Sequence, residues 1–198
     1  MLKRVFDFIL SGILLFLFSL LILVIAILVK LDSKGDIIYK AERAGKNNKR
    51  FEMYKFRSMI SEADKVNIYS TSTDDIRITK IGKILRKYKL DELPQLINIL
   101  KGDMSFVGPR PEVKYYTDKF DKKEKEILSV KPGIVDFASI KFKDEGEILA
   151  KSNIKDKNKA YEQLIWPEKK RLQLKYVGER NFWLDIKIIL NTLSCLLK

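Results

Sequence analysis

The sequence contains no histidine and only one cysteine, Cys195, among its 198 residues. The absence of histidine excludes Ser-His and Cys-His nucleophile systems, histidine-ligated metals and imidazole acid–base chemistry. A single cysteine excludes an internal disulfide framework and a cysteine-rich zinc site. Any catalysis must therefore use carboxylates, lysine, arginine, tyrosine or a hard metal ion such as magnesium.

The common phosphate-binding motifs are missing as well. The chain has no G-x-x-x-x-G-K-[ST] and no G-x-G-x-x-G after a strand. Its length suits one domain with an appendage. Positive charge is abundant, however: 39 Lys and Arg against 26 Asp and Glu give a net charge of +13. This excess indicates an anionic partner, whether nucleic acid, a membrane surface or a phosphorylated substrate.

Residues 8–29, "FILSGILLFLFSLLILVIAILV", carry no charge. At about 1.5 Å per residue this run is roughly 33 Å long as a helix, enough for a bilayer core of about 30 Å. A signal peptide has a shorter apolar region and ends in a small-residue cleavage site, whereas this run ends in "VKLDSKG". We predict a membrane-inserted helix or helical hairpin over residues 1–30 and a cytoplasmic domain over residues 31–198.

Two topologies are compatible with the charges that flank this run. Lys3 and Arg4 precede it, and a longer basic cluster follows it from Lys30. The positive-inside rule keeps the richer C-terminal flank in the cytoplasm. A single span would export Lys3 and Arg4, whereas a re-entrant hairpin keeps both flanks inside but needs a break in the helix. The residues suited to such a break are Ser11, Gly12 and Ser19.

Beyond residue 30 the patterns predict an α+β body that is mostly helical. Residues 36–43 and 50–59 alternate between apolar and polar side chains and suit strands. Helices are predicted over residues 78–88, from Asp91 to Gly102, and over residues 122–130, 144–151, 158–180 (broken near Pro167) and 181–198. The predicted buried faces are Ile81, Ile84 and Leu85 in the first helix and Leu93, Leu96, Ile97 and Leu100 in the second.

The last predicted helix has a broad apolar face. That face contains Trp183, Ile186, Leu190, Leu193 and Leu197. Such a helix suits the headgroup region of a membrane, and it suits burial against the domain core equally well. Both alternatives stay open at this point.

The stretch "LDELPQL", residues 90–96, contains the adjacent acids Asp91 and Glu92. One interpretation is structural, with Asp91 as a helix N-cap, Glu92 facing the helix dipole and Pro94 tolerated in the first turn. The other is functional, because arginines and lysines lie on both sides of the pair. Arg110 stands between two prolines in "GPRP", and its planar fork can hold a phosphate at two points.

Four motifs occur in an order and spacing that resemble a known family. They are "KRVFDFIL", "YKFRSM", "LRKYKLDELPQLINILKGDMSFVGPRP" and "VKPGIVDFASI". Together they are similar to the bacterial sugar transferases, the monotopic phosphoglycosyl transferases whose small members include the bacillosamine phosphotransferase of N-glycosylation. The resemblance extends from residue 3 to about residue 195 and favours the functional interpretation of Asp91 and Glu92.

The resemblance implies transfer of a sugar 1-phosphate from a UDP-sugar to undecaprenyl phosphate, with release of UMP and a requirement for Mg²⁺. It assigns Asp91 as the nucleophile that forms an aspartyl phosphosugar, and Glu92 as a second magnesium ligand or a partner of the lipid phosphate. The helix dipole is expected to keep Asp91 ionised. The phosphate-binding residues implied are Lys55, Arg57, Arg86, Arg110 and Lys143. Anionic membrane lipids are the expected further partner, and nucleic acid is not; the catalytic domain would face the cytoplasm at the bacterial inner membrane.

Two segments depart from the family pattern. Members usually break the membrane helix at a Ser-Pro pair, where this chain has Ser19 and Leu20. Many members carry "ITGWAQVNGRN" where this chain has "IVDFASIKFKDE", so Lys143 stands at the usual arginine. Because arginine and lysine are not interchangeable at a two-point phosphate site, the sugar specificity is expected to differ.

Two other functional classes remain to be distinguished. A non-catalytic scaffold would hold anionic lipid or nucleic acid on its basic surface, with an affinity that follows salt and ignores the acidic pair. A transferase that moves the sugar alone would release UDP. The nucleotide that is released separates all three hypotheses.

Overall fold

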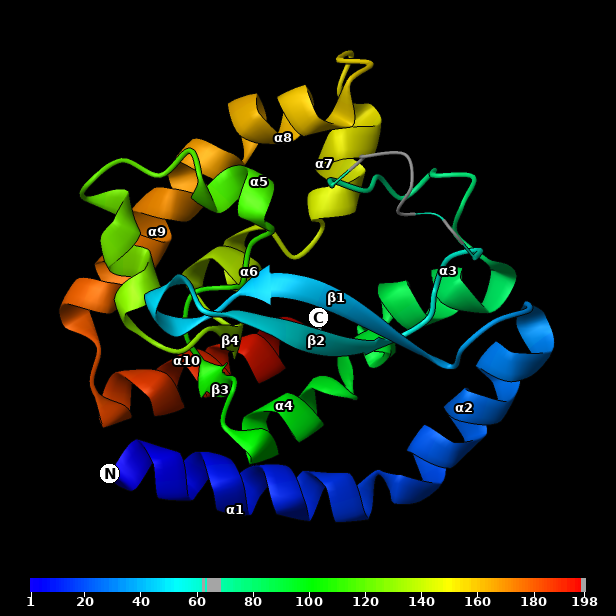
Figure 1. Cartoon of the computed structure of the whole chain (residues 1–198), viewed down its shortest axis with the longest axis horizontal. Helices are drawn as coiled ribbons and strands as arrows, with labels where there is room; N and C mark the ends of the chain where they lie inside the picture. Colours follow the sequence, from blue (N-terminus) through cyan, green and yellow to red (C-terminus); the bar gives the residue numbers. More distant parts are fainter. Residues whose placement is uncertain (62, 64–68, 197–198) are drawn as a thin grey trace.

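The computed structural model describes residues 1–61, 63 and 69–196, and it is a mixed α/β structure that is 58% helical (Figure 1). The helices are α1 (Leu2–Leu17), α2 (Ser19–Asp32), α3 (Lys80–Lys87), α4 (Gln95–Lys101), α5 (Lys114–Thr117), α6 (Phe137–Lys141), α7 (Glu145–Lys151), α8 (Lys157–Leu164), α9 (Trp166–Glu179) and α10 (Phe182–Leu196). The strands are β1 (Ile38–Ala44), β2 (Arg50–Phe56), β3 (Ser105–Val107) and β4 (Gly133–Val135), and the short 3-10 turns used below are η1 (Lys46–Asn48), η3 (Leu90–Glu92) and η4 (Glu124–Ser129). The predicted α+β, mostly helical class is confirmed.

The apolar N-terminal segment forms two helices rather than one. Among the described residues, no single helix combines the length and hydropathy needed to cross a bilayer; α1 and α2 do so only as a pair, bent by 64°. The bend lies at Phe18, immediately before Ser19, and Gly12 lies within an uninterrupted α1. Of the residues suggested for a break, only Ser19 therefore adjoins it, and the break forms without a proline.

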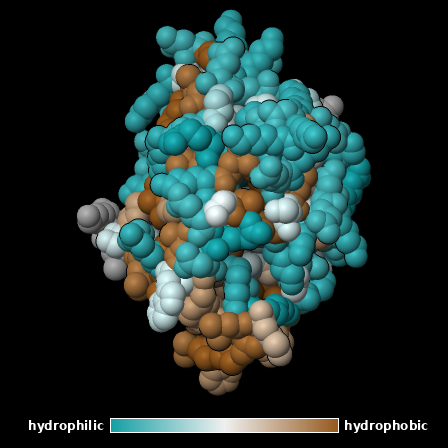
Figure 2. Space-filling view, turned by 90° about the vertical axis from the view of Figure 1, so that its left-hand side faces the viewer, coloured by the Kyte–Doolittle hydropathy of each residue, from teal (hydrophilic) through white to brown (hydrophobic). Residues whose placement is uncertain are grey.

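The bent pair runs along the lower edge of the molecule in Figure 1, with α4 above α1 and α3 beside α2. Its outer side is apolar and exposed: Phe16, Leu20 and Leu31 are 80%, 72% and 79% exposed. Figure 2, seen from the end at which α1 begins, shows hydrophobic side chains gathered at the same lower edge, below a largely hydrophilic body. An exposed apolar surface of this kind marks a site of interaction with a membrane or another protein.

The N-terminal flank of the bent pair is fastened to the body. The Lys3 ammonium donates to Asp185 Oδ2 at 2.5 Å and to the Val107 carbonyl at 2.9 Å. The Arg4 guanidinium donates to two carbonyls in the last turn of α4, at 2.6 and 2.8 Å. Because the last carbonyls of a helix lack partners within it, a cation there stabilises the helix end.

The C-terminal flank of the pair is fastened as well. The Arg57 guanidinium donates to the carbonyls of Val29 at 3.1 Å and Ser33 at 2.5 Å, at the end of α2. Asp32 Oδ2 accepts a hydrogen bond from the Ile81 amide of α3 at 3.2 Å. Both ends of the apolar pair therefore lie against the same body.

The β1–β2 hairpin crosses the middle of the molecule in antiparallel register, from Ile38 opposite Phe56 to Ala44 opposite Arg50. Its two strands confirm the prediction for residues 36–43 and 50–59. One face of the hairpin packs on α4, where Met53 and Ile99 are buried. The parallel pair β3–β4 was not predicted, because each strand has only three residues.

The prediction of burial is wrong for two residues. Ile84 in α3 is 52% exposed and Ile97 in α4 is 40% exposed. Helix α3 approaches the body through Gly82 and Leu85 instead, so closely that a Cβ at Gly82 would lie 2.0 Å from the Ser58 carbonyl oxygen. A close backbone approach of this kind turns the neighbouring side of the helix, with Ile84, outward.

In the C-terminal half the predicted helices form with one change of helix type, whereas the short helices α5 and α6 were not predicted. Residues 144–151 and 158–180 form α7, α8 and α9 with a break at Ile165, whereas residues 124–129 form the 3-10 turn η4. In α10, Trp183, Leu190 and Leu193 are exposed, while Ile188 is buried; Leu197 lies outside the described residues. Helix α10 thus has one face in the core and an apolar face outside.

Candidate functional site

The acidic pair lies in a sharp turn between α3 and α4. Lys89 adopts a left-handed conformation (φ 56°), and the 3-10 turn η3 follows directly with Asp91 and Glu92. Strained backbone of this kind is concentrated at functional sites. Helix α4 begins at Gln95, so the predicted start at Asp91 is wrong. The N-cap of α4 is Pro94, so the interpretation of Asp91 as the N-cap is wrong too.

The Asp91 carboxylate is enclosed and lacks partners. The residue is 6% exposed, and its Oδ1 is buried without a hydrogen-bond partner. Burial raises the pKa of Asp91 above its usual value, although the charges of Lys55 and Arg86 oppose the rise. This corrects the expectation that a helix dipole keeps Asp91 ionised, because α4 begins four residues later and burial dominates.

Glu92 is engaged by two cations. Its Oε2 accepts from Arg110 Nη1 at 3.1 Å, its Oε1 accepts from Arg110 Nη2, and Lys55 Nζ donates to the same Oε1 at 3.1 Å. Burial opposes ionisation, but Arg110 and Lys55 lower the pKa of Glu92 far below its usual value. Glu92 is thus an ionised carboxylate that holds both cations in place beside Asp91.

Arg86 adds a third cation beside Asp91. It lies in the last turn of α3, and its Nε donates to Ser58 Oγ at 2.8 Å. Helix α3 packs closely against the Ser58 backbone at Gly82, and this places its last turn near the end of β2, where Lys55 lies. Burial lowers the pKa of Arg86, and the nearby Asp91 carboxylate opposes this. Lys55, Arg86 and Arg110 therefore surround a carboxylate with a free oxygen.

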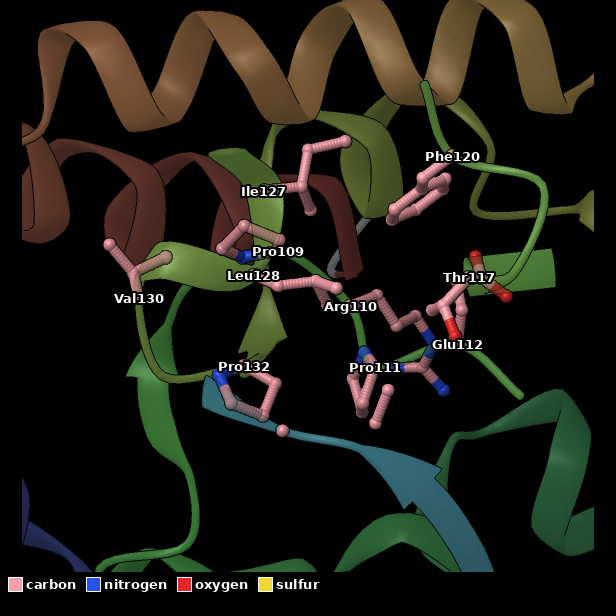
Figure 3. A pocket seen from close by; sticks show the side chains of 12 residues that line it. Pro109, Arg110, Pro111, Glu112, Thr117, Phe120, Ile127, Leu128, Val130 and Pro132 are labelled. Atoms are coloured by element: carbon pink, nitrogen blue, oxygen red, sulfur yellow. The ribbon is translucent and has the colours of Figure 1, made fainter. Parts of the chain in front are cut away.

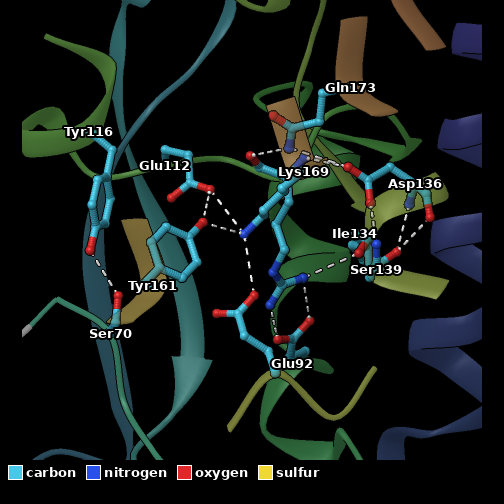
Figure 4. Close-up of polar contacts among 12 residues, drawn as sticks. Ser70, Glu92, Glu112, Tyr116, Ile134, Asp136, Ser139, Tyr161, Lys169 and Gln173 are labelled. Carbon is cyan, nitrogen blue, oxygen red and sulfur yellow. Dashed lines mark hydrogen bonds and ion pairs between the residues drawn. The ribbon is translucent and has the colours of Figure 1, made fainter. Parts of the chain in front are cut away.

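Arg110 is held by the backbone of its loop as well as by Glu92. Strands β3 and β4 meet so closely that a Cβ at Gly133 would lie 2.1 Å from the Gly108 amide nitrogen. The backbone amide of Arg110 donates to Asp136 Oδ2 at 3.2 Å. The Nη1 of the Arg110 guanidinium donates to the Ile134 carbonyl at 3.2 Å. These contacts (Figure 4) fix the guanidinium from both ends of the side chain.

Two residues behind Arg110 were not predicted. Asp136 caps α6 through Ser139, whose amide donates to Asp136 Oδ1 at 2.6 Å. Gln173 Nε2 donates to Asp136 Oδ2 at 3.3 Å and to the Arg110 carbonyl at 3.4 Å. Asp136 and Ser139 have capping-box spacing, which was a readable signal for a helix start. Gln173, on α9, had no such signal.

Two predicted phosphate-binding residues lie elsewhere. Arg57 contacts the end of α2, as described above, and Lys143 Nζ donates to the Cys195 carbonyl at 3.4 Å. Of the five basic residues predicted, the structure brings Lys55, Arg86 and Arg110 to the acidic pair. Position in the sequence alone did not separate Arg57 from Lys55, two residues earlier on β2.

A small pocket lies behind the Pro109–Pro111 loop (Figure 3). Its lining is mostly apolar and includes Phe120, Ile127 and Val130. Asp91, Glu92, Lys55 and Arg86 are not among its lining residues. The pocket therefore supports the loop that carries Arg110 and does not contain the acidic pair.

A buried charge cluster lies next to this loop (Figure 4). Lys169 Nζ lies 3.0 Å from Glu112 Oε1 and donates to the Tyr161 hydroxyl at 2.8 Å, and that hydroxyl donates to Glu112 at 2.8 Å. Burial disfavours the charge on Lys169, but Glu112 and Glu145 raise its pKa well above the usual value. The cluster joins α9 and α8 to the segment that follows Arg110.

We expect Lys169→Met to lower the free energy of unfolding by about 3 to 5 kcal/mol, because it leaves the buried Glu112 carboxylate without its cation. Thermal or urea unfolding measures the change. The double variant Glu112→Gln, Lys169→Met should recover part of the loss, since no buried charge then remains unpaired. Wild-type stability in Lys169→Met would contradict the proposed contribution of this ion pair.

The residues near Asp91 fit a magnesium ion only in part. The described part of the chain contains no group of three or more His, Cys, Asp or Glu residues able to hold a metal. The Asp91 carboxylate forms no ion pair with a neighbouring cation of the described residues, whereas both oxygens of Glu92 already accept hydrogen bonds from cations. Magnesium is commonly held by one or two carboxylates together with substrate phosphates and water. Asp91 fits such a shared site, and Glu92 fits only by exchanging a cation.

Comparison with known proteins gives matches along the whole chain. The model of the family described as "Bacterial sugar transferase" matches residues 1–198. The UDP-N-acetylgalactosamine-undecaprenyl-phosphate N-acetylgalactosaminephosphotransferase of Aeromonas hydrophila is 34% identical over 98% of this chain and 43% of its own length. The uncharacterized sugar transferase EpsL of Bacillus subtilis is 36% identical over 95% of this chain and 83% of its own length.

A third relative is the UDP-glucose:undecaprenyl-phosphate glucose-1-phosphate transferase of Escherichia coli. It is 36% identical over 97% of this chain. This chain spans 39% of its length, so it corresponds to less than half of that relative and of the one from Aeromonas.

Proposed function

Because the chain belongs to the bacterial sugar transferase family, we propose that it transfers a sugar 1-phosphate from a UDP-sugar to undecaprenyl phosphate and releases UMP. The names of two relatives, which specify transfer of a sugar phosphate to undecaprenyl phosphate, support this reaction. The observation that carries the proposal is the buried Asp91 carboxylate, with one unpaired oxygen and three cations around it.

In the first step, a carboxylate oxygen of Asp91 attacks the phosphorus next to the sugar. The bond from that phosphorus to the bridging oxygen breaks, and UMP leaves with the electron pair. The product on the protein is an aspartyl phosphosugar. In the second step, a phosphate oxygen of undecaprenyl phosphate attacks the same phosphorus, and the bond to Asp91 breaks. Dividing the transfer in this way means that two bulky substrates need not bind together.

The basic residues around Asp91 reduce the repulsion between an anionic nucleophile and an anionic diphosphate. Glu92 holds Lys55 and Arg110 beside Asp91 before any substrate arrives, so little reorganisation is needed during the reaction. Magnesium, when bound at Asp91, would neutralise further charge on the substrate phosphates. Burial raises the pKa of Asp91, and each of these positive charges opposes that rise by stabilising the ionised carboxylate that attacks.

We further propose that α1 and α2 insert into the bacterial inner membrane from its cytoplasmic face as a re-entrant pair. Supporting this are the exposed apolar side of the pair and the attachment of both flanks, through Lys3 and Arg57, to one body. The start of α10 lies beside α1, with the Phe6 and Phe182 rings 5.6 Å apart. The exposed Trp183 is thus suited to the membrane interface, where anionic lipids attract the basic body.

A cysteine at residue 2, in a Cys195→Ser background, tests the re-entrant topology. In intact cells we expect no labelling by a membrane-impermeant thiol reagent until the membrane is permeabilised, because Lys3 and Arg4 hold this end on the cytoplasmic body. Asp118→Cys, at an exposed position of the body, provides the matched cytoplasmic control. Labelling of residue 2 from outside would contradict the hairpin and indicate a single span.

The reaction itself is tested by incubating the protein with undecaprenyl phosphate and a panel of UDP-sugars that includes UDP-N-acetylgalactosamine and UDP-glucose. UMP as the released nucleotide is the expected result. UDP would instead identify a transferase of the sugar alone. The absence of any released nucleotide, together with salt-dependent binding to anionic vesicles that Asp91→Asn leaves unchanged, would favour the scaffold hypothesis.

A further inference from the structure

A polar stripe leads from α4 to the acidic pair. Leu93 and Pro94 have helical backbone angles, so helical geometry continues from η3 into α4. Three polar residues of this segment, Asp91, Gln95 and Asn98, are buried, and Asp91 interacts with the charge of Lys55 on β2. Asn98 Oδ1 accepts from the Tyr54 amide at 2.9 Å, which shows that Asn98 faces β2.

Within this stripe, Asn98 has hydrogen-bond partners and its two neighbours do not. The Asn98 amide also donates to the Glu52 carbonyl at 2.7 Å. Gln95 is completely buried, yet neither its Nε2 nor its Oε1 has a partner. Asp91 Oδ1, one helical turn away, is the other unpaired atom of the stripe. A buried polar group without a partner destabilises the fold, so an apolar residue at position 95 would suit the fold better.

The two unpaired groups are complementary. A carboxamide nitrogen is a donor and a carboxylate oxygen is an acceptor, and both groups are buried on consecutive turns of the same segment, η3 and the start of α4. Of the two Asp91 oxygens, only Oδ1 is both buried and unpaired. A hydrogen bond from Gln95 to Oδ1 would leave Oδ2 as the oxygen that reacts.

We propose that Gln95 is a positioning residue of the transfer reaction, whose carboxamide N–H donates to Asp91 Oδ1 in the reacting state and presents Oδ2 to the substrate phosphorus. This inference rests on the proposed function, because it presumes that Asp91 attacks. Gln95 itself does not touch the substrate. Its effect is to fix the carboxylate in the orientation for attack, and even a small misplacement of a reacting group costs about a hundredfold in rate.

The test compares Gln95→Met with Ser105→Ala. The first removes the carboxamide with little loss of side-chain length; the second removes another buried and unpaired group, Ser105 Oγ, from β3. For Gln95→Met we expect kcat to fall about 10- to 100-fold while KM for the UDP-sugar changes by less than about threefold, since only orientation is lost. Its Tm should stay the same or rise. Ser105→Ala should keep the wild-type kcat, with Tm unchanged or higher.

Gln95→Glu is measured in parallel, because it keeps the side-chain length and replaces the N–H donor with an acceptor. The inference predicts a loss of kcat in this variant too. Wild-type kcat in either variant would overturn the inference. So would a loss of activity in which both variants also have a Tm well below that of Ser105→Ala, because Gln95 would then be needed for the stability of the fold. If the wild type itself releases no UMP, the proposed function fails; if wild type and Gln95→Met release UMP equally, only this inference fails.

Discussion

Asp91→Asn is expected to abolish UMP release, with a fall in kcat of at least about 10³-fold, because the amide cannot form the aspartyl phosphosugar. The fold should persist, since the substitution is isosteric and removes a carboxylate whose burial is unfavourable. Tm is therefore expected to stay the same or rise, as is common when an active-site group is replaced. UMP release and thermal unfolding of the purified protein measure the two quantities.

Asp118→Asn is the matched control for this variant. Asp118 is an exposed carboxylate that pairs with Lys114 on the surface, so its loss should leave UMP release unchanged. Turnover close to wild type in Asp91→Asn would exclude Asp91 as the nucleophile.

Glu92→Gln should be severely impaired, because it disrupts the ion pairs that hold Arg110 and Lys55 beside Asp91.

Arg110→Lys is expected to lower kcat about 100-fold, although the charge is kept. The guanidinium reaches both oxygens of Glu92 and the Ile134 carbonyl at once, which requires its planar fork. An ammonium on a flexible stem cannot make this set of contacts and at the same time hold a phosphate at two points. Steady-state rates of UMP release, with the UDP-sugar saturating, measure the effect.

Arg171→Lys serves as the control for that substitution. Arg171 pairs with Glu168 on an exposed part of α9, so exchange for lysine there should leave activity unchanged. A fully active Arg110→Lys protein would show that position 110 needs only a diffuse positive charge, and the two-point grip would have to be abandoned.

Elements with a strong local pattern were predictable from the sequence. The alternation of residues 36–43 and 50–59 predicted the two strands, and the apolar run predicted a helix with Ser19 among three residues suited to a break. The short parallel strands β3 and β4 were not predictable, because they depend on contacts between segments far apart in the chain. The start of α4 was also misplaced, since the left-handed Lys89 and the 3-10 turn carry no clear sequence signal.

The same distinction holds at the site. The acidic pair and Arg110 stood out through their unusual neighbours, but the assignment of basic residues did not follow from the sequence. Lys55 and Arg57 occupy the same motif, yet one contacts Glu92 and the other the end of α2. No sequence pattern singled out Gln95, because what distinguishes it is a buried carboxamide without hydrogen-bond partners in the folded protein.

The central claim, a covalent intermediate on Asp91, is tested most directly by incubating the protein with its UDP-sugar and Mg²⁺ in the absence of any lipid acceptor. The account predicts release of UMP up to one equivalent per protein. It also predicts that intact-mass analysis finds the added mass of one sugar phosphate, localised by peptide mapping to Asp91 and lost on addition of undecaprenyl phosphate. Release of UMP only when the lipid is present, with no change in protein mass, would contradict the covalent mechanism.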